Sequence, residues 1–327
     1  MLTYAIRRTL QAIPLMIIIS LIIFAILDKM PGGPLAPYLQ NPHITAADIK
    51  RLEHNFGLDR PFPIRYAAWI GHYVTGDWGW SQTQSEPVTQ SMLERLPATL
   101  KLTVSSLIFA LIVGLSFGII AAVKPYSPID YFVTTFAFFG QSMPVFFFAI
   151  LLQYALAVHG IHAQAFGYAL NFTLPSAGLT STEGGGFFDQ VRHLVMPVIV
   201  LSLLQVATFS RFTRASMQEV LHTDYMRTAA AKGLSFGRII LKHGLKNALM
   251  PVVTIVALTM PGLVGGAIVT ETIFAYPGMG RLFITALNQQ DFSLLQGYLV
   301  VLAVLVVAFN LAADLTYGWL DPRIRYD

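Results

Sequence analysis

The chain has 327 residues, of which 55% are hydrophobic and 12% are charged, and its mean hydropathy is +0.61. This composition is far more apolar than that of a soluble domain, so we predict an integral membrane protein. The net charge of +4 comes from basic residues at the ends of apolar runs, where a cytoplasmic charge bias explains them without nucleic-acid binding. Because cysteine is absent, disulfides, thiol redox chemistry and thiolate metal sites are excluded.

Six apolar runs are long enough to cross a bilayer as helices. The first, residues 9–27, follows Arg7 and Arg8 and would be about 29 Å long as a helix. We interpret it as a retained helix, because no small-residue cleavage site of a signal peptide follows it. The other predicted spans are residues 102–123, 131–158, 194–209, 248–270 and 297–319.

The distribution of basic residues predicts the orientation of these spans. With the amino terminus inside, the seven basic residues of the loop 211–246 fall in the cytoplasm, together with Lys124, Arg323 and Arg325. The chain then divides into a first helix with its cytoplasmic start, an extracytoplasmic segment, a five-helix core and a cytoplasmic tail. These regions are residues 1–27, 28–97, 98–319 and 320–327.

The extracytoplasmic segment is predicted to contain three short helices. Thr45 and Asp48 have the spacing of a capping box at the start of the first helix, and Gly57 is placed to end it. A second helix is expected over residues 63–73 and a third over residues 87–96.

Several kinds of chemistry are missing from the sequence. No G-x-x-x-x-G-K-[ST] motif is present, so this chain holds no ATP in a P-loop and any ATPase must be a partner subunit. Almost no ionisable residue lies within the predicted spans; the exception, Asp314, is near the cytoplasmic end of the last one, which disfavours coupling to an ion gradient. There is no H-E-x-x-H motif or Cys/His cluster, so we expect no metal site.

The sequence G-L-S-F-G occurs at residues 114–118 and again at 233–237, and it matches the G-x-S-x-G pattern of serine hydrolases. A nucleophile elbow needs a preceding strand, and neither copy has one. A six-span intramembrane serine protease with Ser116 as nucleophile is therefore a remote alternative, since its candidate histidines lie at the outer ends of spans. These are His159, His162 and His193.

Helix breakers and polar side chains within the spans indicate a candidate translocation path. Pro144 interrupts the third span and Pro261 with Gly262 interrupts the fifth, and such breaks are tolerated beside protein or water. The segment 271–281 is too polar to span and is a candidate outer gate. The candidates for path or gate are Gln141, Pro144, Gln205, Pro261, Gly262, Glu271 and Pro277. Helix-to-helix hydrogen bonds and a plain surface loop are the alternative interpretations.

The basic loop between the fourth and fifth spans is predicted to form helix, turn and helix parallel to the membrane. Gly233 is placed as a left-handed stop and Ser235 as the cap of a second helix over residues 236–243. The small side chains of residues 229–231 leave a surface on which another protein can sit closely, with charge from Arg227 and Lys232 around it. The alternative is a basic amphipathic helix bound to anionic lipid.

Ordered motifs along the whole chain resemble one known family. They include R-L-P-A-T-L from Arg95, T-D-Y-M-R-T-A-A-A-K-G from Thr223, N-A-L-M-P from Asn247, E-T-I-F-A-Y-P-G-M-G-R from Glu271 and D-P-R-I-R-Y from Asp321. In this order they resemble the B-type inner-membrane permease of bacterial oligopeptide and dipeptide ABC importers. The wider importer family has Glu-Ala-Ala-x-x-x-Gly at the loop, where this chain has Arg227, Thr228 and Ala229 before Gly233.

The resemblance implies an all-α integral membrane protein with six transmembrane helices in the type I ABC importer fold and a small helical exterior segment. It implies a non-catalytic subunit of the bacterial cytoplasmic membrane, with both termini in the cytoplasm and no cofactor of its own. The implied partners are a second, homologous permease, two cytoplasmic ATPases that bind ATP and Mg²⁺, and an extracytoplasmic peptide-binding protein. Nickel chelates and glutathione are alternative substrates on the same scaffold.

The resemblance also implies a set of residues that couple the permease to the ATPases. They are Asp224, Tyr225, Arg227, Thr228, Ala229, Ala230, Ala231, Lys232, Gly233, Ser235 and His243.

Overall fold

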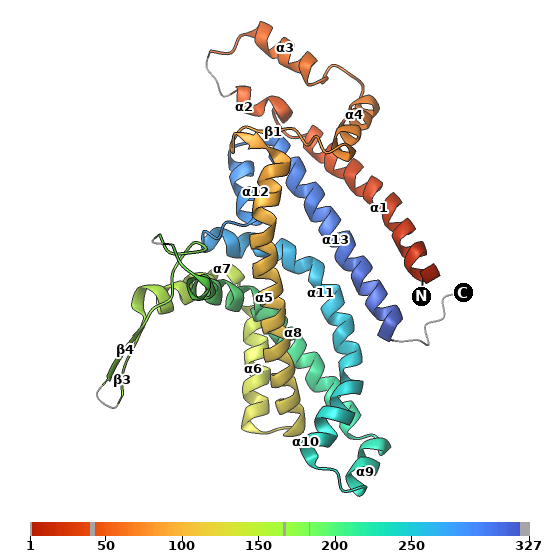
Figure 1. The fold of residues 1–327 in the computed structure, drawn as a ribbon, viewed down its shortest axis with the longest axis vertical. Coiled ribbons are helices and arrows are strands. Elements are labelled where there is room, and N and C mark those ends of the chain that lie inside the picture. Colours follow the sequence, from red (N-terminus) through yellow and green to blue (C-terminus); the bar gives the residue numbers. More distant parts are fainter. Residues whose placement is uncertain (1, 40–42, 166–167, 183, 321–327) are drawn as a thin grey trace.

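The computed structural model describes residues 2–39, 43–165, 168–182 and 184–320. Helices make up most of this part of the chain, and they form an elongated bundle in which the long helix α5 extends over much of the length (Figure 1). The predicted cytoplasmic tail beyond residue 320, with Arg323 and Arg325, lies outside the described residues.

The spanning helices agree with the six predicted spans. Among the described residues, five helical stretches are long and apolar enough to cross a membrane, and a bent pair makes a sixth if it is counted as one span. The five belong to α1 (Leu2–Asp28), α5 (Val88–Val123), α8 (Phe187–Leu221), α10–α11 from Phe236, and α13 (Phe292–Leu320).

The bent pair confirms the predicted interruption of the third span. Helix α6 (Pro128–Ser142) and helix α7 (Val145–Gln153) meet at an angle of 108°. Pro144 stands in the break as the N-cap residue of α7, since proline lacks the N–H that would continue the helical bonds. A π-helical turn, η2 (Tyr154–His159), follows α7.

Helix α11 (Leu245–Ile273) continues across residues 261 and 262, so the predicted interruption of the fifth span is wrong. The side chain of Pro261 lies outside the described residues, and Gly262 is exposed. A membrane helix tolerates proline when neighbouring groups satisfy the freed carbonyl.

Helix α5 joins two elements that the sequence suggested were separate. The predicted helix over residues 87–96 and the span over residues 102–123 form one helix, with Pro97 inside it and Pro87 as its N-cap. The first turns of α5 bury Val88 and Met92 in a cluster with residues of α13. This tertiary packing outweighs the hydrogen bond that Pro97 cannot donate.

Helix α5 packs most extensively on α8, through two glycines of the first G-L-S-F-G copy. A Cβ at Gly114 would lie 2.8 Å from Phe209 Cβ, and a Cβ at Gly118 would lie 2.6 Å from the Ser210 carbonyl oxygen. Only glycine allows the two backbones to approach this closely. Ser116 lies in the interior of this helix, which contradicts a nucleophile elbow and the alternative of a serine protease. The side chain of His162, one of the candidate histidines for that protease, lies outside the described residues.

Helices α1 and α13 pack side by side (Figure 1). Near one end of this pair, Arg8 Nη1 lies 3.2 Å from Asp314 Oδ2. The acidic residue of the last predicted span is therefore paired with Arg8 of α1, which directly precedes the first predicted span.

The segment between α1 and α5 contains η1 (Gly33–Leu35), α2 (Ala36–Leu39), α3 (Ala46–Asn55) and α4 (Phe62–Val74). The prediction of a capped helix followed by a second helix is confirmed.

The cap of α3 forms as its sequence predicts. Thr45 Oγ1 accepts the Asp48 N–H at 3.2 Å, and the Asp48 carboxylate accepts the Thr45 N–H at 3.2 Å. At the other end Gly57 has φ of +65°, and its N–H donates to the His54 carbonyl while the next N–H donates to the Glu53 carbonyl. This is the Schellman pattern, which needs a left-handed residue at that point.

Long-range polar contacts with α1 and α13 fix α4 on the membrane helices. Arg65 pairs through both guanidinium Nη atoms with the Asp28 carboxylate at the end of α1. Trp69 Nε1 donates to Gln296 Oε1 of α13 at 3.1 Å.

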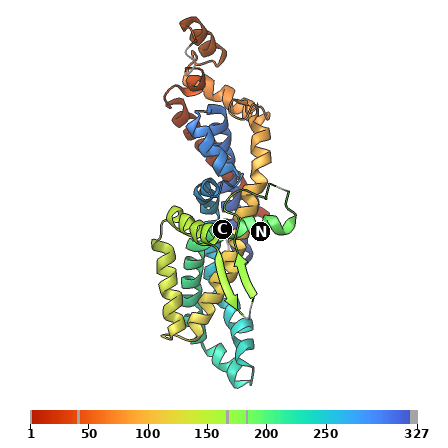
Figure 2. The same ribbon diagram turned by 90° about the vertical axis from the view of Figure 1, so that its left-hand side faces the viewer.

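Two short antiparallel strand pairs lie outside the all-α expectation. Strands β1 (Trp80–Ser81) and β2 (Glu86–Pro87) form a tight hairpin before α5. Strands β3 (Ile161–Ala165) and β4 (Tyr168–Phe172) pair in register from Ile161–Phe172 to Ala165–Tyr168. They project from the side of the bundle (Figure 1) and face the viewer in Figure 2.

Candidate functional site

The predicted coupling segment protrudes at one end of the bundle, as helix α9 (Asp224–Ala231), a turn and helix α10 (Phe236–Arg238) (Figure 1). Gly233 has φ of +76° and stops α9 as predicted. Ser235 holds the N-cap position of α10, but its side chain makes no capping hydrogen bond, so this part of the prediction is wrong.

The second helix of this segment does not end near His243. Helix α10 runs into a π-helical segment, η3 (Ile239–Gly244), which runs directly into α11. Ile239 and Ile240 are buried in clusters under the coupling segment. Their burial explains why the helix continues where a break was predicted. Single π turns within α-helices are rare and often occur at functional sites.

One face of α9 is packed inward, and this changes the predicted docking surface. Met226 and Ala229 are buried against Ile239, so Ala229 does not belong to the exposed surface. His243 is half-buried in η3. The other predicted coupling residues are exposed: Asp224, Tyr225, Arg227, Thr228, Ala230, Ala231, Lys232, Gly233 and Ser235.

Two contacts order this exposed surface, which we call the coupling surface. Arg227 Nη1 lies 3.4 Å from Asp224 Oδ1 within α9. Asn247 Nδ2 of α11 donates to the Tyr225 hydroxyl at 3.0 Å, which joins α9 to the long helix. Phe236 and Leu241, each 63% exposed, add apolar area that the sequence prediction did not include.

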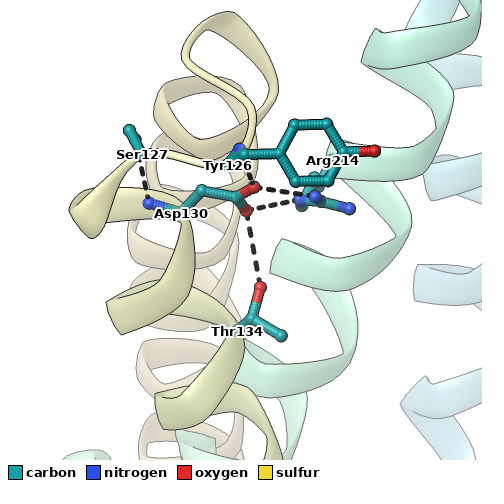
Figure 3. Close-up of polar contacts among 5 residues, drawn as sticks. All are labelled: Tyr126, Ser127, Asp130, Thr134 and Arg214. Carbon is teal, nitrogen blue, oxygen red and sulfur yellow. Dashed lines mark hydrogen bonds and ion pairs between the residues drawn. The ribbon is translucent and has the colours of Figure 1, made fainter.

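Helix α8 is longer than the predicted span, so Arg211 and Arg214 lie in a helix and not in the loop. Arg214 donates from Nε and Nη2 to the two oxygens of Asp130 in α6, at 2.6 and 2.8 Å (Figure 3). The Asp130 carboxylate also accepts the Tyr126 N–H at 2.8 Å. Sequence reasoning missed this pair because its members are 84 positions apart.

The polar candidates for the path have different surroundings. Gln141 Oε1 accepts from Arg211 Nη1 at 3.1 Å, between α6 and α8. Gln205 Oε1 is buried and has no hydrogen-bond partner among the described residues. Gln141 and Gln205 are therefore not joined by hydrogen bonds in the described part of the chain. Glu271 and Pro277 lie elsewhere, at the junction of α11 with helix α12 (Met279–Asn288).

Glu271 is fully buried at this α11–α12 junction. Its carboxylate accepts from the Thr99 hydroxyl at 2.7 Å and from the backbone N–H groups of Gly280 and Arg281 at 2.7 and 3.2 Å. Thr99 Oγ1 in turn accepts the Met279 N–H at 2.8 Å. A carboxylate thereby satisfies the free donors in the first turn of α12 and ties them to α5.

The junction leaves no room for side chains at its glycines. A Cβ at Gly278 would overlap the Glu271 carboxylate, and a Cβ at Gly280 would lie 2.6 Å from Ile268 Cα. Glu271 is therefore an internal anchor of the segment 271–281 and does not line an open passage in this conformation.

Together, these features define a polytopic helical membrane protein with a helical surface projecting beyond the bundle at one end. A profile described as "Binding-protein-dependent transport system inner membrane component" matches residues 114–326, and a profile for the N-terminal part of such membrane components matches residues 1–103. The chain belongs to this family of transport-system membrane components.

Curated relatives match over their whole length. The chain is 39% identical over 328 residues to the oligopeptide transport system permease protein AppB of Bacillus subtilis, covering all of both chains. It is also 39% identical over 337 residues to the dipeptide transport system permease protein DppB of Escherichia coli K12, covering all of this chain and 99% of the relative.

Solved structures share the fold. An inward-facing structure of the MetNI methionine ABC transporter matches with a TM-score of 0.52 at 18% identity, over 71% of this chain and 97% of the other. An amino acid ABC transporter structure matches with a TM-score of 0.52 at 14% identity, over 71% and 94%. The predicted type I ABC importer permease fold is confirmed.

Proposed function

We propose that this chain is the permease subunit of an ATP-driven peptide importer in the bacterial cytoplasmic membrane, with both termini in the cytoplasm. Its partners are a homologous permease that supplies the other half of the path, two ATPase subunits that bind ATP and Mg²⁺, and an extracytoplasmic peptide-binding protein. The names of the full-length relatives, which are oligopeptide and dipeptide permeases, support peptides over nickel chelates or glutathione.

The observation that carries the mechanism is the direct connection between the coupling surface and a spanning helix. Helix α9 is joined to α11 by the contact between Asn247 and Tyr225, and α10 continues through η3 into α11. When the ATPases close, they move α9 and α10. Helix α11 moves with them because α10 runs into it without a loop and α9 is hydrogen-bonded to it. This is rigid-body transmission between inward-facing and outward-facing states.

The docking assignment is tested by a double substitution on α9. Arg227→Glu reverses an exposed charge, and Ala230→Trp places a bulky side chain one helical turn away on the same surface. The matched control is Lys50→Glu with Ala47→Trp, two exposed residues with the same spacing on α3 at the other end of the molecule.

The α9 variant is expected to lose co-purification of the ATPases in mild detergent and to lose peptide uptake, while the α3 variant keeps the ATPases bound. Unchanged co-purification and uptake in the α9 variant would refute the docking assignment.

A further inference from the structure

A cleft of about 200 Å³ lies beside the α11–α12 junction. Its walls come from the β1–β2 turn, α5 and α12, and they include Gln84, Arg95, Pro277, Arg281 and Thr285. Helix α12 and the β1–β2 turn, which line the cleft, lie toward the end of the bundle opposite the coupling surface (Figure 1).

Two arginines give the cleft a positive charge that nothing in its lining balances. Arg95 is half-buried on α5, and Arg281 is exposed on α12. No acidic residue lines the cleft, and neither guanidinium forms an ion pair within the described ranges of the chain. Arg281 uses Nη1 to donate to the Ala275 carbonyl at 2.7 Å, which leaves further N–H groups for a ligand.

The buried carboxylate of Glu271, next to the cleft, makes no ion pair with either guanidinium among the described residues. Glu271 accepts from the backbone N–H of Arg281 and not from its side chain. Its role is to hold the first turn of α12, so that the Arg281 side chain leaves from a fixed backbone position. A charged group on a fixed backbone loses less entropy when it binds a ligand.

Paired guanidiniums are suited to planar oxyanions, because their N–H groups match the geometry of a carboxylate. Resting on the proposed function in peptide import, we propose that this cleft binds the α-carboxylate of the peptide substrate beside the α11–α12 junction. An α-carboxylate is common to peptides of every sequence, so its recognition does not restrict the side chains that are carried.

The absence of cysteine from the chain allows a direct test in the assembled importer. Thr285→Cys places a single thiol in the wall of the cleft, and its labelling by a neutral maleimide is followed with and without alanyl-alanine. At about ten times its Kd the dipeptide leaves roughly one site in ten free by mass action, so labelling should slow about tenfold. Alanyl-alanine amide, which lacks the carboxylate, should give no protection.

Three comparisons make this test specific. Protection should disappear when Arg95→Gln or Arg281→Gln is added. Gln84→Cys, in the β1–β2 turn that also lines the cleft, should behave like Thr285→Cys if the latter folds poorly. Val74→Cys, at a position that is 81% exposed on α4, should label at the same rate with either compound.

Equal protection by the amide, protection that survives both arginine substitutions, or no protection at either cysteine would overturn the proposal. Uptake of alanyl-alanine by the unmodified complex is measured separately. If the complex takes up alanyl-alanine but the thiol is not protected, the carboxylate site is refuted and the proposal of peptide import is retained. If the thiol is protected but the dipeptide is not taken up, peptide import is contradicted and the carboxylate site is retained.

Discussion

Asp130 and Arg214 form a two-point ion pair that joins the first turn of α6 to α8, with only 4% of the Asp130 side chain and 28% of the Arg214 side chain exposed. Arg211, one turn earlier on α8, makes a single hydrogen bond to neutral Gln141. The two arginines therefore offer a matched comparison.

Replacing Arg214 with Gln should destabilise the protein far more than replacing Arg211 with Gln. The first change leaves a buried carboxylate without its partner, which costs on the order of 3 kcal/mol, whereas the second removes one neutral-acceptor bond. Thermal unfolding in detergent measures the difference. Asp130→Asn combined with Arg214→Gln should recover part of the loss, and equal destabilisation by the two single changes would contradict this account.

Glu271→Gln should loosen the α11–α12 junction. The amide offers one acceptor oxygen where the carboxylate offers two, so its NH2 group faces either the Thr99 hydroxyl or the N–H groups of Gly280 and Arg281. A buried donor is thereby left unsatisfied at a cost of about 1–3 kcal/mol. Limited proteolysis should then cut within residues 274–281 faster than in the unmodified chain. Thr272→Val, one residue away at an exposed position, is the control and should leave the cleavage rate unchanged.

Gly118→Val should disrupt the contact between α5 and α8, since the new side chain would meet Thr213 and the Ser210 carbonyl. Overpacking of this kind costs about 1–3 kcal/mol, and the yield of folded, monodisperse protein should fall. Gly71→Ala, in helix α4 with no atom within 4 Å of the added Cβ, should leave the yield unchanged. A similar loss for both variants would argue against the close helix contact.

Tyr225→Phe should separate ATP hydrolysis from transport in the assembled complex. The change removes one hydrogen bond to Asn247, worth about 0.5–1.5 kcal/mol, and leaves the aromatic ring on the coupling surface. ATPase co-purification and hydrolysis should persist while peptide uptake per ATP falls by a factor of up to about ten. A parallel fall in hydrolysis and uptake would place the effect at docking instead. Tyr126→Phe, at a position 79% exposed outside the coupling surface, is the control.

The elements that the sequence predicted well are those governed by local chemistry. The cap of α3 at Thr45 and Asp48, the stop at Gly57 and the turn at Gly233 each depend on residues a few positions apart. The break between α6 and α7 could likewise be predicted, because it depends on the local backbone chemistry of Pro144.

The elements that escaped prediction depend on residues far apart in the chain. The continuity of α5 through Pro97 follows from packing against α13, and Glu271 became an internal anchor because Thr99, 172 positions away, and the start of α12 surround it. Ala229 looked exposed in sequence, yet the return of η3 beneath α9 buries it against Ile239. No local pattern carries this information.

The uninterrupted course from α10 through η3 to the end of α11, residues 236–273, has a consequence for rotation as well as for displacement. As a helix this stretch is about 57 Å long. The coupling surface and Glu271 therefore lie on one continuous helix. Adding a single residue within it would turn one end about 100° against the other. The number of residues between the coupling surface and the α11–α12 junction therefore fixes the orientation of the junction about the helix axis.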